Sequence, residues 1–381
     1  MKQTRLKTTA VFLFSFGIII SSFAQSTINV VSTAVPFLRI SPDARAGGMG
    51  DVGIATTPDA NSNFWNLGKI PFAEAKTAAS LTYSPWLKDI APDIFLVTLA
   101  GYHQLDEEQA ISASIRYFNL GQIQFTDFNG NSLGQGRPRE FAIDFGYSRK
   151  LSDKLGVGVA LRYINSSLVS GDVGGTVYKP GQTVAADLSL YHNGLDENGQ
   201  GFSWGIALSN LGGKVGYTDN ALSKDFIPAN AGIGGAYTAV LDEDNKITFG
   251  VDFNKLLVPS LPYDPNATDS ANQAALDAYH GYSVFQSWFK SFNNNAYTFA
   301  GGAEYTYNNQ FSVRAGYFFE PQSQGGRKYA TVGVGLKYQA FGFNFSYLVP
   351  SGNGVTRNPL SNTLRFGIIF NLDNVNANNG Q

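Results

Sequence analysis

The sequence contains no cysteine, few charged residues and only three histidines. The absence of cysteine from all 381 residues excludes disulfide bonds, thiolate nucleophiles and cysteine-ligated metals. Charged residues make up 15% of the chain, against about 25% in soluble globular proteins. The formal net charge of −2 provides no cationic surface of the kind that binds nucleic acid. We therefore expect neither thiol chemistry nor a nucleic-acid partner, and the composition disfavours a soluble enzyme.

Glycine and aromatic residues are abundant instead, with 42 Gly, 29 Phe and 19 Tyr. The mean hydropathy is nevertheless close to zero, at −0.11. A transmembrane β-barrel has this composition because its lipid-facing and lumen-facing residues alternate and cancel in the average. Beyond residue 24, no apolar run reaches the roughly 18 residues of a membrane-spanning helix. Only a closed barrel would then satisfy the backbone of a membrane-embedded chain.

Residues 1–24 have the pattern of a Sec-type signal peptide. Lys2, Arg5 and Lys7 precede an apolar stretch, and small residues precede the expected cleavage site between Ala24 and Gln25. No cysteine follows that site, so the pattern is not that of a lipoprotein. The sequence predicts export from the cytoplasm.

Period-2 alternation dominates the chain from about residue 76. Phe141, Ile143 and Phe145, for example, alternate with the small or polar Ala142 and Asp144, which is the pattern of a strand with one apolar face. We predict a fourteen-stranded antiparallel transmembrane β-barrel, because an even count of strands of roughly 9 to 11 residues is typical of bacterial barrels. The predicted strands are residues 76–84, 92–103, 109–119, 138–150, 154–169, 181–192, 201–210, 228–240, 246–258, 295–307, 310–320, 326–339, 341–349 and 361–372.

Long and short connections alternate along the chain. The long ones are residues 120–137, 170–180, 211–227, 259–294 and 350–360, and tight turns such as Asn308-Asn309 separate them. In outer-membrane barrels the short turns face the periplasm. Aromatic pairs at strand ends, such as Tyr117 with Phe118 and Phe318 with Phe319, predict interfacial girdles.

Charged residues on the strands fall largely on the face predicted to point inward. Both signs occur, which predicts a lumen cross-braced by ion pairs, since charges facing lipid would cost several kcal/mol. A substrate-selective row of charges is the alternative. The residues are Arg116, Asp144, Arg162, Asp187, Asp252, Glu304, Arg314, Lys337 and Arg365.

Residues 25–75 lack the alternation and contain a distinctive run of short motifs. These are Asp43-Ala44-Arg45-Ala46-Gly47-Gly48-Met49-Gly50, then Asp59-Ala60, then Asn63-Phe64-Trp65-Asn66. The run resembles the N-terminal hatch of FadL-type barrels. More narrowly, it resembles the PorV family of FadL-like outer-membrane components of the type IX secretion system of Bacteroidota. The resemblance extends over the whole mature chain.

The resemblance implies a hatch inside the lumen that includes Asp43, Arg45, Gly48, Gly50, Asn63, Trp65 and Asn66. It also implies a shuttle rather than a catalyst. Members of the family accept secreted cargo with a type IX C-terminal signal domain from an SprA-type translocon. They pass that cargo to a PorU-type sortase, which removes the signal and can attach lipopolysaccharide.

Independently of this, the last predicted strand resembles the signal read by the barrel assembly machinery, with Gly367, Phe370 and Leu372 at the matching spacing. We therefore expect a signal peptide at 1–24, a hatch segment at 25–75, a barrel at 76–372 and a polar periplasmic tail at 373–381. The barrel would lie in the outer membrane, in contact with its lipid and lipopolysaccharide.

Several motifs suggest chemistry but have a simpler explanation. Residues 48–53 match the dinucleotide fingerprint G-x-G-x-x-G, but the strand and helix that this fingerprint requires are not predicted; the glycines instead predict tight turns at positive φ. His280 with Asp277 and Ser283 is a weak candidate for acyl transfer. We expect no catalytic site, no cofactor and no metal.

The connection at residues 259–294 is exceptionally long, and such loops are usually functional. Within residues 271–290 the apolar positions have helical spacing, which predicts a helix that either closes the barrel mouth as a lid or binds a partner. We expect Val284, Phe285, Trp288 and Phe289 to dock on the translocon or on the cargo signal domain. Two other functions remain open: a FadL-type transporter of hydrophobic small molecules and a lipopolysaccharide-modifying barrel enzyme.

Overall fold

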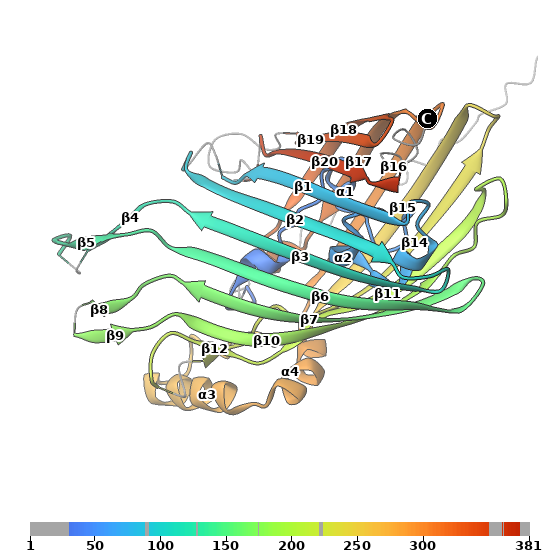
Figure 1. Ribbon diagram of the computed structural model, residues 1–381. Coiled ribbons are helices and arrows are strands. Elements are labelled where there is room, and N and C mark those ends of the chain that lie inside the picture. Colours follow the sequence, from blue (N-terminus) through green and yellow to red (C-terminus); the bar gives the residue numbers. More distant parts are fainter. Residues whose placement is uncertain are drawn as a thin grey trace, which may run out of the picture.

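Fourteen antiparallel strands form a closed ring in the computed structural model, as predicted (Figure 1). The structure describes residues 30–87, 91–126, 129–173, 175–220, 224–349, 360 and 362–373, so the predicted signal peptide and most of the polar tail lie outside the described residues. The ring consists of β1 (Thr77–Pro85), β2 (Ile94–Gln104), β3 (Gln109–Leu120), β6 (Arg139–Ser152), β7 (Leu155–Ser167), β10 (Gly181–His192), β11 (Gly201–Gly212), β14 (Asn230–Val240), β15 (Asn245–Leu256), β16 (Tyr297–Tyr307), β17 (Phe311–Phe319), β18 (Lys328–Tyr338), β19 (Phe341–Leu348) and β20 (Leu364–Asn371).

The register of the strands follows from their alternating sequence. In the β6–β7 pair, Phe145 lies opposite Leu161 and both side chains are 67% exposed on the outer face. The neighbouring pair, Asp144 and Arg162, is buried on the inner face. A one-residue slip would exchange the two faces, so the need to keep the charges away from lipid fixes the register.

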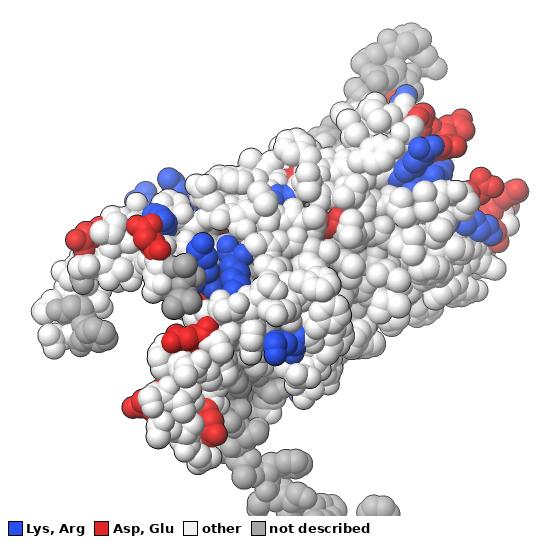
Figure 2. All heavy atoms as spheres, turned by 90° about the horizontal axis from the view of Figure 1, so that it is seen from below, with Lys and Arg blue, Asp and Glu red and all other residues white. Residues whose placement is uncertain are grey.

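The outer surface has the charge distribution of a membrane protein. Figure 2 shows charged side chains gathered at the two ends of the molecule, with a broad and largely uncharged band between them. Among the described residues, no helix is long and apolar enough to cross a membrane.

One end of the ring carries tight turns and the other carries long connections, as predicted. Asn308 and Asn309 have φ of +50° and +52°, which suits the tight hairpin between β16 and β17. We call this the short-turn end, and the opposite one the long-loop end. Three two-stranded hairpins extend from the long-loop end: β4 (Ile123–Thr126) with β5 (Ser132–Gly136), β8 (Gly171–Val173) with β9 (Thr176–Tyr178), and β12 (Val215–Gly216) with β13 (Lys224–Asp225). The short 3₁₀ helix η5 (Gln322–Gln324) precedes β18.

A chain segment with four short helices lies inside the ring (Figure 1). We call residues 36–72 the hatch segment; it contains the 3₁₀ helix η1 (Pro36–Arg39), α1 (Ala44–Gly48), α2 (Ser62–Trp65) and the 3₁₀ helix η2 (Leu67–Phe72). Helix α1 packs against β17 to β20, and η2 packs against β6, β7 and β10. The segment therefore spans the lumen from one wall to the other.

Two of the predicted girdle residues face the lumen instead of the lipid. Phe118 is buried and stacks on Phe37 of the hatch segment, with ring centroids 6.2 Å apart. Phe318 stacks on Tyr329 at 4.8 Å. The girdle prediction was wrong for both, because adjacent residues of a strand point to opposite faces and only one of each aromatic pair can face lipid.

Candidate functional site

The first helix of the hatch segment is anchored to the barrel wall by charge. Asp43 caps α1 by accepting a hydrogen bond from the Arg45 backbone N at 2.8 Å. Arg45 donates to both carboxylate oxygens of Glu304 on β16, at 2.7 and 3.0 Å, and Arg314 donates to the same carboxylate at 2.6 Å. Burial, with repulsion from Asp59, raises the pKa of Asp43 to about 6. Arg45 and Glu304 thus fix α1 to the wall.

The glycines after Arg45 let the hatch backbone approach the strands closely. Gly50 has φ of +75°, and a Cβ there would lie 2.6 Å from the backbone N of Tyr317. A Cβ on Gly48 would lie 3.0 Å from the Cα of Gly333 on β18. The predicted turn at positive φ therefore occurs at Gly50, where it seats the segment against the wall.

The second half of the hatch segment is fixed by amide and indole side chains. Trp65 donates from Nε1 to Asp43 at 3.1 Å, which ties the two halves together. Asn63 accepts from Ser112 of β3 at 3.1 Å. Asn66 caps η2 and donates to the Leu190 carbonyl of β10 at 2.9 Å. Each predicted hatch residue thus contacts the wall or its own segment.

A buried lysine that the sequence analysis did not single out also stabilises the segment. Lys69 donates to the carbonyl oxygens of Gly53 and Thr56, at 2.6 and 3.2 Å. Burial lowers its pKa to about 8. Its position three residues after the last motif gave no indication that it folds back inside the segment.

Ion pairs cross-brace the lumen wall, as predicted. Arg162 bridges Asp144 and Asp187, with its Nη2 2.7 Å from Asp187. Arg116 adds a contact to Asp144 at 3.5 Å. Lys337 differs: its side chain is 45% exposed and pairs with Glu74 at 3.5 Å, because it lies near the short-turn end of β18, where the lumen opens to water.

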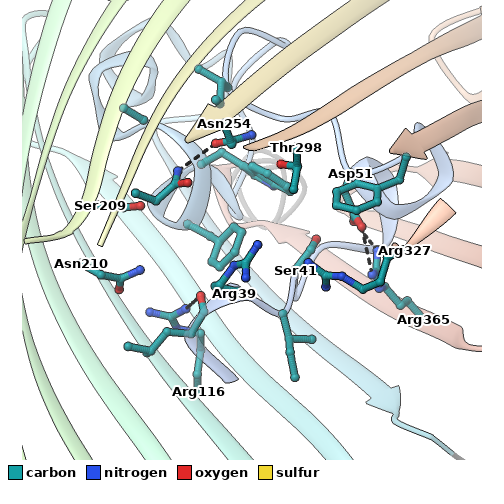
Figure 3. Close-up of a pocket in the computed structure, with 18 of the residues that line it drawn as sticks. Arg39, Ser41, Asp51, Arg116, Ser209, Asn210, Asn254, Thr298, Arg327 and Arg365 are labelled. Carbon is teal, nitrogen blue, oxygen red and sulfur yellow. Dashed lines mark hydrogen bonds and ion pairs between the residues drawn. The ribbon is translucent and has the colours of Figure 1, made fainter. Parts of the chain in front are cut away.

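The hatch segment separates two cavities in the lumen. The cavity at the short-turn end has an empty volume of about 1820 Å³ and is lined by polar residues that include Asp59, Thr248 and Thr306. The cavity at the long-loop end has an empty volume of about 900 Å³ (Figure 3). Five arginines line it, namely Arg39, Arg116, Arg162, Arg327 and Arg365, and Asp51 is the acidic residue among its lining residues. We call it the arginine pocket.

The arginine pocket is the part of the site that sequence analysis found least completely. Arg39 was not singled out, and neither was Arg327, although it lies within the predicted strand 326–339. The structure joins them through Glu320, which accepts from Arg327 at 2.7 and 2.8 Å and from Arg39 at 3.4 Å. Residues far apart in the chain meet here only because the ring closes, so a single sequence gives no signal for the cluster.

The long connection forms two helices instead of one. These are α3 (Asp269–Gly281) and α4 (Val284–Lys290), followed by the 3₁₀ helix η4 (Ser291–Asn293). Ser283 and Gln286 form a capping box that starts α4 and breaks the predicted continuous helix. The Ser-x-x-Gln spacing in the sequence could therefore have indicated that a new helix begins here.

The two helices lie outside the ring of strands, beside the ends of the barrel strands, and not across its opening (Figure 1). The lid prediction was therefore wrong. Tyr279 of α3 is buried with Phe226, Leu256 and Ala296 at the rim, which fixes the helices to one side. In contrast, Phe285, Phe289 and Phe292 are 63%, 63% and 67% exposed, and Trp288 is partly buried.

The candidate acyl-transfer residues have other partners. His280 Nε2 lies 3.6 Å from Asp225, Asp277 accepts from Gln273, and Ser283 caps α4. Among the described residues, no cluster of His, Asp and Glu is arranged to hold a metal ion.

The last strand closes the ring by pairing with β1. Gly367 faces inward, and a Cβ added there would lie 3.3 Å from the Cβ of Ala44 in the hatch segment. Phe370 packs edge-on against Phe341 at 5.2 Å, and the exposed Leu372 follows the end of the strand.

Comparison with known proteins assigns the family. A protein-family model described as type IX secretion system protein PorV matches residues 23–263, more than half of the chain. The chain belongs to the PorV family. The protein is accordingly an outer-membrane component of the type IX secretion system, with the short-turn end in the periplasm. No curated protein matches the sequence.

Solved structures with a similar fold are FadL-type outer-membrane barrels. The alignment with the Ralstonia pickettii toluene transporter TbuX covers 87% of this PorV-family chain and 97% of the TbuX chain, at 14% identity and a TM-score of 0.51. The CymD monoaromatic hydrocarbon channel aligns with 87% and 97%, at 12% identity and a TM-score of 0.51. At such low identity the likeness extends to the fold alone.

Proposed function

We propose that this PorV-family barrel binds the C-terminal signal domain of cargo leaving an SprA-type translocon and carries it to a PorU-type sortase, without itself catalysing a reaction. The observation that carries the proposal is the position of α3 and α4, which present aromatic side chains outside the ring on the extracellular side. Exposed aromatic residues are typical interface anchors. A transporter of small molecules needs an open route through the lumen, and here the hatch segment is fixed to both walls.

Affinity purification from the native membrane tests this function. We expect the tagged barrel to co-purify with a very large barrel protein and with secreted proteins that carry the signal domain. Recovery of the barrel with a bound hydrocarbon or fatty acid, and without any protein partner, would contradict the proposal and support the transporter. Altered acylation of lipid A on deletion of the gene would instead support the enzyme.

The aromatic face of α4 is the proposed docking site. Replacing Val284, Phe285, Trp288 and Phe289 with serine should reduce secretion of type IX cargo by about tenfold or more, because interface anchors of this kind contribute 2 kcal/mol or more each. The measurement is the amount of cargo in the medium. Because α4 lies outside the ring, the variant barrel should keep its heat-modifiable mobility on a gel.

Serine replacements at Leu133 and Val177 provide the matched control. Both side chains are exposed on other extracellular hairpins, β4–β5 and β8–β9, so the control removes apolar side chains from the same side of the barrel, although fewer and smaller ones than the α4 variant. We expect near-normal secretion from this control. Normal secretion from the α4 variant as well would show that α4 is not the docking site.

A further inference from the structure

The arginine pocket continues outward into a second, more apolar compartment. This outer compartment has an empty volume of about 890 Å³. Its apolar lining residues include Val31, Leu87, Leu256 and Leu360. Arg39, Trp86 and Arg327 line both compartments. A ligand from the extracellular side would thus cross an apolar compartment before it meets the arginines.

The arginines that line the arginine pocket outnumber the carboxylates that pair with them. Glu320 is the partner of both Arg39 and Arg327. Asp144 is the partner of both Arg116 and Arg162, although Arg162 also holds Asp187. With the Arg365–Asp51 pair at 2.5 Å, five guanidinium groups face four carboxylates. Arg39 and Arg116 therefore each share their carboxylate with a second arginine.

The guanidinium groups of Arg116 and Arg39 are the least completely paired. Arg116 is 2% exposed, its Nη2 makes no hydrogen bond beyond the 3.5 Å ion pair with Asp144, and its Nη1 reaches the Leu38 carbonyl only at 3.4 Å. Arg39 keeps a 30% exposed side chain. Burial, together with Arg327, lowers its pKa to about 10. Figure 3 shows both arginines beside the same space. A buried donor without a partner is costly, and an anion would satisfy it.

The opposite wall of the pocket is polar but neutral. It is formed by Ser209, Asn254 and Thr298 (Figure 3), and Asn230 donates to Asn254 at 2.8 Å. Asn210 also lines the pocket, but its side chain is already bonded to Arg162 and to the Pro228 carbonyl. Amide and hydroxyl side chains of this kind hydrogen-bond the backbone groups of an extended peptide. A hydrocarbon tail would offer no hydrogen bonds to the side chains of Ser209 and Thr298. The wall thus favours a peptide over a fatty acid as the carrier of the anionic group.

We propose that the arginine pocket binds the C-terminal carboxylate of a peptide that enters from the extracellular side. Arg39 and Arg116 hold the carboxylate, the polar wall of Ser209, Asn254 and Thr298 faces the peptide backbone, and the outer compartment takes apolar side chains. This inference rests on the proposed function, since cargo that ends in a signal domain would supply such a terminus.

The test compares one peptide in two chemical forms. The probe is a synthetic peptide with the terminal residues of a secreted cargo protein, either as the free acid or as the amide, titrated calorimetrically into the purified barrel in a neutral maltoside detergent. We expect the free acid to bind about tenfold more tightly, because charge-assisted hydrogen bonds to arginine are lost in the amide. Arg39→Gln should reduce that preference to about twofold or less. Arg149→Gln, at an exposed periplasmic turn, should leave it unchanged.

Equal binding of the two forms by the unmodified barrel would overturn the inference, and so would binding of decanoate without binding of the peptide. A binding measurement with the purified signal domain distinguishes failure of this inference from failure of the proposed function. If the domain binds equally well with a free and an amidated terminus, the proposed carboxylate site is contradicted but the proposed shuttle function is not. If the domain does not bind at all, the proposed shuttle function is contradicted.

Discussion

Replacing Arg162 with methionine is expected to lower the free energy of unfolding by about 3–5 kcal/mol, because it leaves a buried carboxylate without its partner. Arg162 is 4% exposed and holds both Asp144 and Asp187. Arg116 compensates only Asp144. The lower stability should appear as a lower urea concentration at which half of the barrel is unfolded. The folded fraction is measured on a gel, where the folded barrel migrates differently from the heated one.

The double variant Arg162→Met with Asp187→Asn separates charge from packing. It leaves Arg116 paired with Asp144 and restores neutrality in the cluster. We expect it to recover most of the lost stability. Arg149→Met is the exposed control, since its pair with Glu108 lies at a periplasmic turn and should contribute about 1 kcal/mol or less. If the double variant were as unstable as the single one, unpaired charge would not be the cause.

Replacing Gly316 with valine is expected to displace the hatch segment and open the lumen. A Cβ at Gly316 would lie 2.1 Å from the backbone carbon of Met49 and 2.2 Å from the backbone N of Gly50. Neither backbone atom can move without unseating the turn. The conductance in planar bilayers should rise by about an order of magnitude, because a barrel without its plug leaves an aqueous lumen.

Gly301→Val is the matched control. A Cβ at Gly301 would meet its nearest neighbour, a ring carbon of Phe299, at 3.7 Å, which is ordinary contact. This variant should remain closed. If Gly316→Val formed an intact barrel with unchanged conductance, the hatch segment would not be the element that closes the lumen.

The barrel itself could be predicted because its physical constraint is local. Each strand must alternate along its own sequence, so Phe145 and Asp144 reveal their faces without knowledge of any neighbour. The alternation of long loops with turns such as Asn308-Asn309 is equally local. The fourteen strands and their order followed from these two patterns.

The lumen could be predicted only in part because its contacts join distant residues. Arg39 and Glu320 are 281 positions apart, and only closure of the ring brings them together. The contact of Phe118 with Phe37 of the hatch segment likewise joins positions far apart in the chain. The sequence predicted cross-bracing charges, but not which arginines share one carboxylate.

The central claim is that cells need this barrel to release type IX cargo. Deletion of the gene, followed by quantification of signal-domain proteins in the medium and in the periplasm, tests it most directly. We expect cargo to disappear from the medium and to accumulate in the cell with its signal domain uncleaved. The unmodified gene should restore release, and the α4 serine variant should not. Normal release from the deletion strain, with a defect in uptake of hydrophobic compounds instead, would contradict the account.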